Sequence, residues 1–163
     1  MENLLYLHGL DGSLSDEKRA IMASSYNVIV PQIDYRKDNV DTIIDTIFKE
    51  NDICAVVGSS MGGYVGYHVS RKWELPCLLF NPALFMRSVE LNFATQTKYG
   101  LYVNPMIIVL GKKDKVVKSD VTMRELIKDN SIARINFSYH TNLEHRIDVN
   151  TFDDEFYKFS QSF

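Results

Sequence analysis

The sequence Val-Val-Gly-Ser-Ser-Met-Gly-Gly-Tyr occupies residues 56–64 and continues an apolar run. It contains the pattern G-x-S-x-G, in which Ser60 is flanked at a distance of two residues by Gly58 and Gly62. A strand before this pattern and a helix after it indicate a sharp turn that lifts the central serine above a sheet. The glycines allow the strand and helix to approach without Cβ clashes. The pattern predicts Ser60 as a nucleophile, whereas Ser59 is out of register.

Short apolar runs alternate with amphipathic segments along the chain. Five of the runs end at Gly or Pro, which is typical of strands buried on both faces. The expected strands cover residues 4–7, 28–30, 53–57, 78–80, 106–110 and 132–139. The segments between them have helical periodicity, with expected helices at about 15–24, 40–48, 62–73, 119–127 and 151–163. This alternation predicts an α/β protein with a parallel sheet covered on both faces.

Capping residues refine two of these helices. Asp38 or Asn39 precedes the apolar face of the second helix and is a suitable N-cap. Thr151 and Asp154 form a possible capping box before the phenylalanine-rich C-terminal helix.

Composition limits the class of protein. The 163 residues fit one domain, residues 1–163, and are 45% hydrophobic with a formal net charge of -3. The charge and the lack of a dense Lys/Arg run argue against a nucleic-acid partner. The N-terminus has no signal-peptide pattern, and no apolar stretch approaches the roughly 20 residues of a membrane span, so we expect a cytoplasmic protein. Cys54 and Cys77 lie in apolar runs and are expected to be buried thiols rather than a disulfide.

The stretch 83–104 lies outside the strand–helix alternation and is rich in apolar residues. It is interpreted either as a short lid or insertion over a pocket or as a helix packed on the core. Phe85, at its start, and Asn81, just before it, are predicted to belong to a substrate pocket.

A nucleophilic serine needs a base, and the base needs an orienting acid. In a fold with this serine turn, the chain order is Ser, then Asp or Glu, then His. Asp114 follows the fifth expected strand and is the predicted acid, with Asp120 as the fallback. His145 and His140 both follow the last strand, and His145 is favoured as the base because it lies on a loop that can return over the sheet.

An oxyanion hole needs two backbone N–H donors aimed at one point. Met61, directly after the serine, is predicted to supply one. Leu10 is predicted to supply the other, because His8 and Gly9 let the chain turn toward the site after the first strand. Motifs of metal sites and phosphate-binding loops are missing from the sequence, so no metal and no cofactor are expected.

Several of these motifs occur together in one known family, and the chain resembles the YqiA-like esterases, a compact branch of the α/β-hydrolases. The matching pieces are Leu4 to Gly9, Val30 to Gln32, Val57 to Tyr64, Asn81 to Ala83, and Gly111 to Asp114. The resemblance implies a Ser/Asp/His triad and hydrolysis of carboxylic esters or thioesters. Carried over by position, it places Ser60, Asp114 and His145 in that triad.

We therefore expect a three-layer α/β-hydrolase fold with a six-stranded parallel sheet in the order 2-1-3-4-5-6. The expected activity is hydrolysis of a small-molecule ester or thioester through an acyl-enzyme on Ser60. Two alternatives remain at the level of sequence. One is a binding or regulatory protein whose triad no longer works, and the other is an acyltransferase or lyase on the same scaffold. The sequence does not determine the oligomeric state.

Overall fold

Six parallel strands form one sheet in the order β2-β1-β3-β4-β5-β6 in the computed structural model, which describes residues 1–96 and 98–163. The strands are β1 (Asn3–Leu7), β2 (Asn27–Ile29), β3 (Ile53–Ser59), β4 (Cys77–Phe80), β5 (Met106–Gly111) and β6 (Ile135–His140). The predicted sheet and its strand order are confirmed. Because all strands are parallel, the loops that follow them emerge at the same edge of the sheet.

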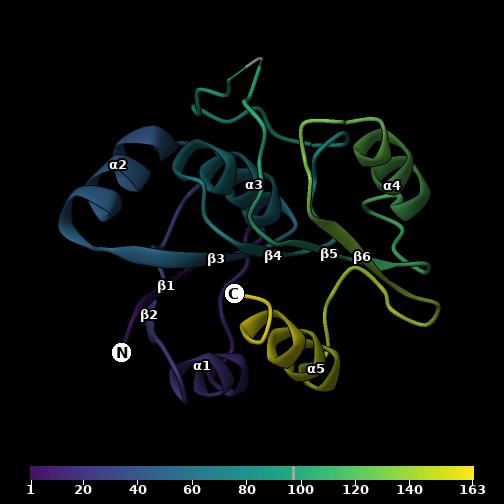
Figure 1. Ribbon diagram of the computed structural model, residues 1–163, viewed down its shortest axis with the longest axis horizontal. Helices are drawn as coiled ribbons and strands as arrows, with labels where there is room; N and C mark the ends of the chain where they lie inside the picture. Colours follow the sequence, from purple (N-terminus) through teal and green to yellow (C-terminus); the bar gives the residue numbers. More distant parts are fainter. Residues whose placement is uncertain (97) are drawn as a thin grey trace.

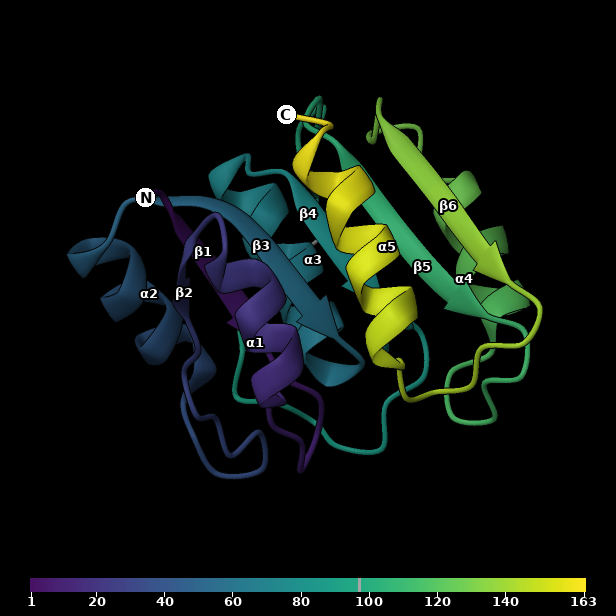
Figure 2. The ribbon, with the colours of Figure 1, turned by 90° about the horizontal axis from the view of Figure 1, so that it is seen from below.

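Helices cover both faces of this sheet and complete three layers (Figure 1). They are α1 (Asp16–Ala23), α2 (Val40–Glu50), α3 (Met61–Trp73), α4 (Ser119–Ile127) and α5 (Val149–Ser160). Figure 1 shows α2, α3 and α4 on one face and α1 and α5 on the other, and Figure 2 shows α1 and α5 side by side across the strands. None of the helices in the described residues is both long enough and apolar enough to span a bilayer.

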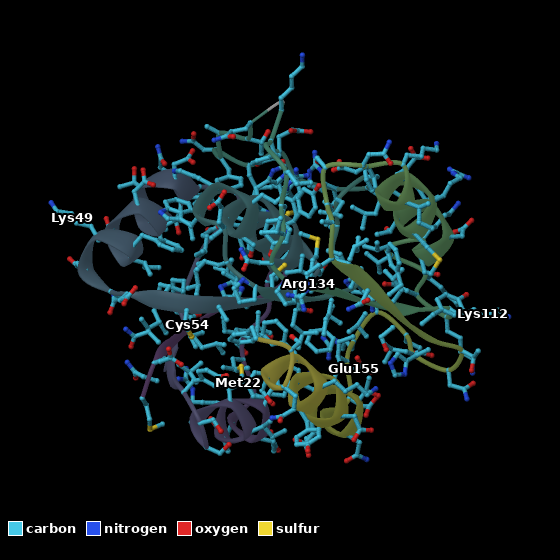
Figure 3. All side chains as sticks on the ribbon, viewed as in Figure 1. Met22, Lys49, Cys54, Lys112, Arg134 and Glu155 are labelled. Atoms are coloured by element: carbon cyan, nitrogen blue, oxygen red, sulfur yellow. The ribbon has the colours of Figure 1, made fainter. Side chains whose placement is uncertain are left out.

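Strand β1 shows how the apolar runs divide between two cores. Its alternate residues Leu5 and Leu7 pack into the core beneath α2 and α3, whereas Leu4 and Tyr6 pack into the core on the side of α1 and α5. Met22 of α1, which Figure 3 labels between that helix and the sheet, is fully buried in the second core. An apolar run without polar interruption is therefore required, because both faces of the strand are buried.

Two helix starts were predicted from capping patterns, with different outcomes. Asn39 caps α2, and its side chain accepts a hydrogen bond from the Thr42 N–H at 3.0 Å, as predicted. The capping box at Thr151 is wrong, because α5 begins earlier. Asp148 is the N-cap and accepts from the Thr151 N–H at 2.9 Å and from the Thr151 hydroxyl at 2.7 Å.

The predicted start of the last strand is also corrected. Ile132 forms an isolated bridge with Tyr102, and the continuous ladder with β5 begins only at Ile135. The position of Tyr102 is fixed by its buried hydroxyl, which donates to the Leu75 carbonyl. Ile132, which the apolar pattern assigned to the last strand, therefore pairs with the segment that precedes β5.

The stretch 83–104 contains no helix or strand within its described residues, so the alternative of a packed helix is not observed; Thr97 lies outside those residues. Figure 1 shows this segment looping over α3. Phe93 packs edge-to-face on Tyr64, and the Tyr99 hydroxyl lies 2.6 Å from Nδ1 of His68. Aromatic contacts with α3 therefore explain why the segment is apolar.

Phe152 is expected to be a main support of the second core. Its ring is 1% exposed and stacks on Phe80 of β4 with a centroid distance of 5.1 Å. Phe152→Ala should lower the free energy of unfolding by about 3–5 kcal/mol, because it leaves a cavity between α5 and the sheet. Urea denaturation measures this loss. Tyr157→Ala on the same helix is the control, since that side chain is 67% exposed, and a loss of equal size there would contradict the prediction.

Candidate active site

The loops after β3, β5 and β6 bring three predicted residues into one hydrogen-bonded series. The Oγ atom of Ser60 lies 2.9 Å from Nε2 of His145, and Nδ1 of His145 lies 2.7 Å from Oδ2 of Asp114. This is the order in which a nucleophile, a base and an orienting acid are arranged in serine hydrolases. The three residues come from distant parts of the chain and meet at the carboxyl edge of the sheet.

Ser60 occupies a strained turn between β3 and α3. Its backbone has φ 53° and ψ -113°, a conformation that L-residues rarely adopt. The turn is fixed by the Ser60 N–H, which donates to the Phe80 carbonyl at 2.9 Å, and by the Ser60 carbonyl, which accepts from the Ala83 N–H at 3.0 Å. The hydroxyl is thereby held at the N-terminus of α3, next to unpaired N–H groups.

The two motif glycines are required by backbone contacts. A Cβ atom on Gly62 would lie 2.1 Å from the Leu7 carbonyl oxygen and 2.4 Å from that of His8. A Cβ atom on Gly58 would lie 2.5 Å from the Gly62 carbonyl oxygen. The lack of a side chain at Gly62 therefore lets α3 approach the end of β1, and its lack at Gly58 lets β3 turn tightly into α3.

The carboxylate of Asp114 is buried and satisfied on both oxygens. Oδ2 faces His145, and Oδ1 accepts from the backbone N–H groups of Val116 at 2.7 Å and Val117 at 2.9 Å. These donors fix the orientation of the carboxylate toward the imidazole. The fallback acid Asp120 is exposed in the first turn of α4.

The two histidines after β5 have different surroundings. His145 faces Ser60, as described, whereas His140 is the last residue of β6 and faces α5. Its Nε2 lies 3.1 Å from Oε1 of the buried Glu155, which also accepts from the Ser138 hydroxyl at 2.8 Å. Thus the geometry favours His145 over His140 as the base, and His140 ties β6 to α5.

The loop after β1 is held by His8, whose ring is buried. The Ile33 N–H donates to its Nε2 at 3.1 Å, so the ring proton lies on Nδ1, which is 2.8 Å from the Gly9 carbonyl oxygen. The hydroxyl of Tyr35 donates to the His8 carbonyl at 2.8 Å, and burial raises the pKa of this phenol, which keeps it a donor. His8 is therefore a support of the loop.

The predicted oxyanion donors lie at the site with unused N–H groups. Met61 begins α3, so its N–H has no acceptor within the helix. The Leu10 N–H makes no hydrogen bond to another part of the chain that the structure describes. Both residues line the same cavity as Ser60 and His145. Their assignment as oxyanion donors stays a prediction.

Asn81 lies elsewhere than predicted. It is fully buried and is not among the residues that line the cavity at Ser60. Its Nδ2 donates to the carbonyls of Glu144 at 3.0 Å and His145 at 3.2 Å, and its Oδ1 accepts from the Gly111 N–H at 2.8 Å. Asn81 therefore positions the loop that carries His145. The backbone of Asn81 has a positive φ of 40°, which Asn tolerates better than most residues. An asparagine directly after a strand was therefore the one sequence signal of a structural role at this position.

A cavity of about 620 Å³ opens beside Ser60, and we call it the apolar pocket. Its apolar side chains come mainly from the loops after β1, β4 and β5: Leu10, Met61, Ala83, Phe85, Met86, Val116 and Val117. Phe85 lines this pocket and is 48% exposed, and its contact with a substrate stays a prediction. The guanidinium of Arg87, also in the wall, donates to the Leu84 carbonyl at 2.6 Å and lies over the Tyr64 ring.

The cysteines take no part in this site. Both thiols are free, and burial raises the pKa of Cys54 to about 11, so its thiolate is not formed near neutral pH. Within the described residues there is no group of three or more His, Cys, Asp or Glu side chains arranged to hold a metal ion.

Solved structures similar to this one place the chain in a known class of fold. The carboxylesterase of Bacillus cereus has 16% identity and a TM-score of 0.68, with 99% of this chain and 89% of that chain covered. An alpha-beta serine hydrolase homologue from Coxiella burnetii has 14% identity and a TM-score of 0.68, covering 98% and 84%. Arabidopsis thaliana SOBER1 has 14% identity and a TM-score of 0.65, covering 98% and 99%. The fold is that of the α/β-hydrolase superfamily.

A narrower assignment comes from the sequence model of the uncharacterised protein family UPF0227, which matches residues 3–101. The chain belongs to this family, the YqiA family, which confirms the resemblance found in the motifs. The matched residues include the β1 loop, the serine turn and Asn81, whereas Asp114 and His145 lie beyond them.

The contacts of Asn81 predict that its two N–H donors restrain the His145 loop. Asn81→Asp keeps the acceptor for the Gly111 N–H but turns both donors into an acceptor that faces two carbonyls. The change should destabilise the protein by at least about 1–3 kcal/mol, the usual cost of an unsatisfied buried polar group. It should also speed hydrogen–deuterium exchange in peptides covering residues 141–147.

Asn142→Asp is the matched control, since it makes the same chemical change at an exposed position of the same loop. It should leave exchange in the peptides unchanged. Equal exchange rates in the Asn81→Asp protein and the unmodified protein would contradict the positioning by Asn81.

Proposed function

We propose that the protein is a serine hydrolase that cleaves carboxylic esters or thioesters through an acyl-enzyme on Ser60. The observation that carries the proposal is the hydrogen-bonded series from Ser60 through His145 to Asp114 at the mouth of an apolar pocket. The fold shared with a carboxylesterase supports it as an analogy.

In the proposed reaction, His145 acts first as a base. Its Nε2 takes the proton of Ser60 as Oγ attacks the acyl carbonyl carbon. The imidazolium that forms is stabilised by the Asp114 carboxylate, whose Oδ2 lies 2.7 Å from Nδ1 of His145. The two N–H donors from Val116 and Val117 hold this carboxylate in place throughout.

The negative charge that develops on the carbonyl oxygen is assigned to the N–H groups of Met61 and Leu10. The N-terminus of α3 adds the positive end of its dipole at the same point. His145 then gives its proton to the leaving oxygen or sulfur, and the acyl-enzyme forms. A water activated by His145 attacks this intermediate and restores the free Ser60.

The acyl group is assigned to the apolar pocket. Its volume and its Phe85, Met86 and Val116 side chains fit an apolar chain, which gains roughly 0.8 kcal/mol for each CH₂ that it buries. Phe85 and Val116 are partly exposed to solvent, at 48% and 59%. An acyl chain would cover this exposed apolar surface.

Replacement of the nucleophile tests the proposal. Ser60→Ala should lower the rate of hydrolysis of nitrophenyl butyrate by about 10³-fold or more, since the acyl-enzyme cannot form. The same change should abolish labelling by a fluorophosphonate probe, which reacts with activated serines. Ser25→Ala, at an exposed serine away from the site, is the control and should leave both readouts unchanged.

Other outcomes would point to the other functions. A folded protein that neither hydrolyses esters nor reacts with the probe would favour a binding or regulatory protein. Labelling of Ser60 together with acyl transfer to a second substrate, in place of water, would favour an acyltransferase. Full activity of Ser60→Ala would exclude the acyl-enzyme on this residue.

A further inference from the structure

A second cavity meets the apolar pocket at the reacting atoms, and we call it the polar pocket. It has a volume of about 380 Å³ and shares Leu10, Ser60 and His145 with the apolar pocket. Its remaining walls differ in chemistry and include the side chains of Lys18 and Arg146. Ser60 thus lies between a mainly apolar space, whose wall includes the cation Arg87, and a space bordered by the two cations Lys18 and Arg146.

The acidic residue in the same wall is already neutralised. Asp11 forms two hydrogen bonds with the Arg36 guanidinium, one of them at 2.8 Å, and this pairing lowers the pKa of the Asp11 carboxyl. Arg146, by contrast, is exposed and has no ion pair with any residue that the structure describes. The polar pocket therefore has an excess of positive charge.

Lys18 is held at the pocket by the chain that follows His145. Its ammonium donates to the Ile147 carbonyl and lies 5.6 Å from the centre of the Phe152 ring. Partial burial lowers the pKa of Lys18, while the charges of Asp148 and Glu17 act in the opposite direction. Asp148 itself is engaged in capping α5, where it binds Thr151.

The geometry of acyl transfer relates the two pockets to the two halves of an ester. In the tetrahedral intermediate, the acyl chain and the leaving group lie on different sides of the carbon bound to Ser60 Oγ. The leaving oxygen must be within reach of His145 Nε2, which protonates it. The wall of the polar pocket continues from His145 into Arg146 and Ile147, so this pocket extends from the proton donor.

We propose that the polar pocket binds the leaving alcohol of the substrate and selects an alcohol that carries an anionic group, a carboxylate or a phosphate, through Arg146 and Lys18. The inference rests on the proposed ester hydrolysis. The reaction remains balanced, because the C–O bond to the alcohol breaks, its oxygen takes the proton from His145, and the anionic group undergoes no chemical change. The natural substrate would thus have an apolar acyl half and a negatively charged alcohol half.

Matched esters test this assignment. The butyrate ester of meta-hydroxybenzoate carries a charged leaving group, and the butyrate ester of meta-hydroxybenzamide is its neutral isostere. We expect kcat/KM to be about tenfold higher for the charged ester, the size of effect that two partly solvated cations produce. This ratio should fall as sodium chloride is added, because salt screens the attraction.

Substitution of Arg146 gives the second measurement. Arg146→Gln should bring the ratio of the two kcat/KM values toward one, and Arg146→Glu should lower it further. The ratio corrects for any general effect of the change on folding or catalysis. Lys112→Gln is the control, because Lys112 is exposed, is absent from the polar pocket and points to solvent at the edge of the molecule in Figure 3; it should leave the ratio unchanged.

Two further pairs fix the orientation and the kind of anion. The phenyl monoester of adipate and its neutral adipamate counterpart place the charge on the acyl half, and the charged member should have no advantage. The butyrate ester of meta-hydroxyphenyl phosphate replaces the carboxylate by a phosphate, and comparison with the benzoate ester identifies which anion the pocket prefers.

The outcomes separate this inference from the proposed function. Equal rates for the charged and neutral leaving groups, or a ratio that Arg146→Gln does not change, would overturn the anionic subsite while ester hydrolysis stands. A preference for the charged acyl half would overturn the orientation. Failure to hydrolyse any of these esters would overturn both.

Discussion

The close contact between the start of α3 and the end of β1 is the constraint on which the site depends. The Cα of Gly62 approaches the carbonyls of Leu7 and His8 so closely that a side chain would overlap them. This approach leaves Ser60 in a backbone conformation that costs on the order of 1–3 kcal/mol. The hydrogen bonds of Ser60 to Phe80 and Ala83 sustain it. This one packing contact thus fixes the position of the Ser60 hydroxyl and brings the loop after β1 beside it.

The positions of His145 and Asp114, the predicted base and acid, depend on a second set of backbone contacts. A Cβ on Gly111 would lie 2.4 Å from the Leu143 carbonyl oxygen, so the loop after β5 lies directly against the loop after β6. The Lys113 N–H donates to that same carbonyl at 3.0 Å. Asn81 adds a side-chain link from β4 to both loops. His145 therefore meets Asp114 because main-chain contacts join the loops after β5 and β6 and the Asn81 side chain ties both to β4, independently of the hydrogen bond between His145 and Asp114.

Differences between the two cavities arise from the elements that border them. The apolar pocket is bordered largely by the start of the segment after β4, where Phe85 and Met86 are exposed, whereas later residues of that segment pack against the core. The polar pocket lies between the β1 loop, α1 and the chain after His145, where charged and hydroxyl side chains predominate. A substrate that joins an apolar group to a polar one could place its apolar group in the apolar pocket and its polar group in the polar pocket. The proposed specificity is thus a consequence of which loops flank the serine on each side.

The sequence by itself determined the features that local spacing controls. Apolar runs such as Leu4 to Leu7 specify strands buried on two faces, and the glycines around Ser60 specify the turn, because each depends only on neighbouring residues. The strand order followed from the family resemblance and is confirmed. Tertiary structure decided the rest. His145 and Ser60 are 85 residues apart. Sequence position already favoured His145 over His140 as the base, and the fold adds that β6 directs His140 toward Glu155 of α5. The sequence analysis assigned Asn81 to the pocket, whereas its side chain donates to backbone carbonyls of the distant loop that carries His145. The direction of those carbonyls depends on the tertiary fold, so a local sequence pattern could not predict it.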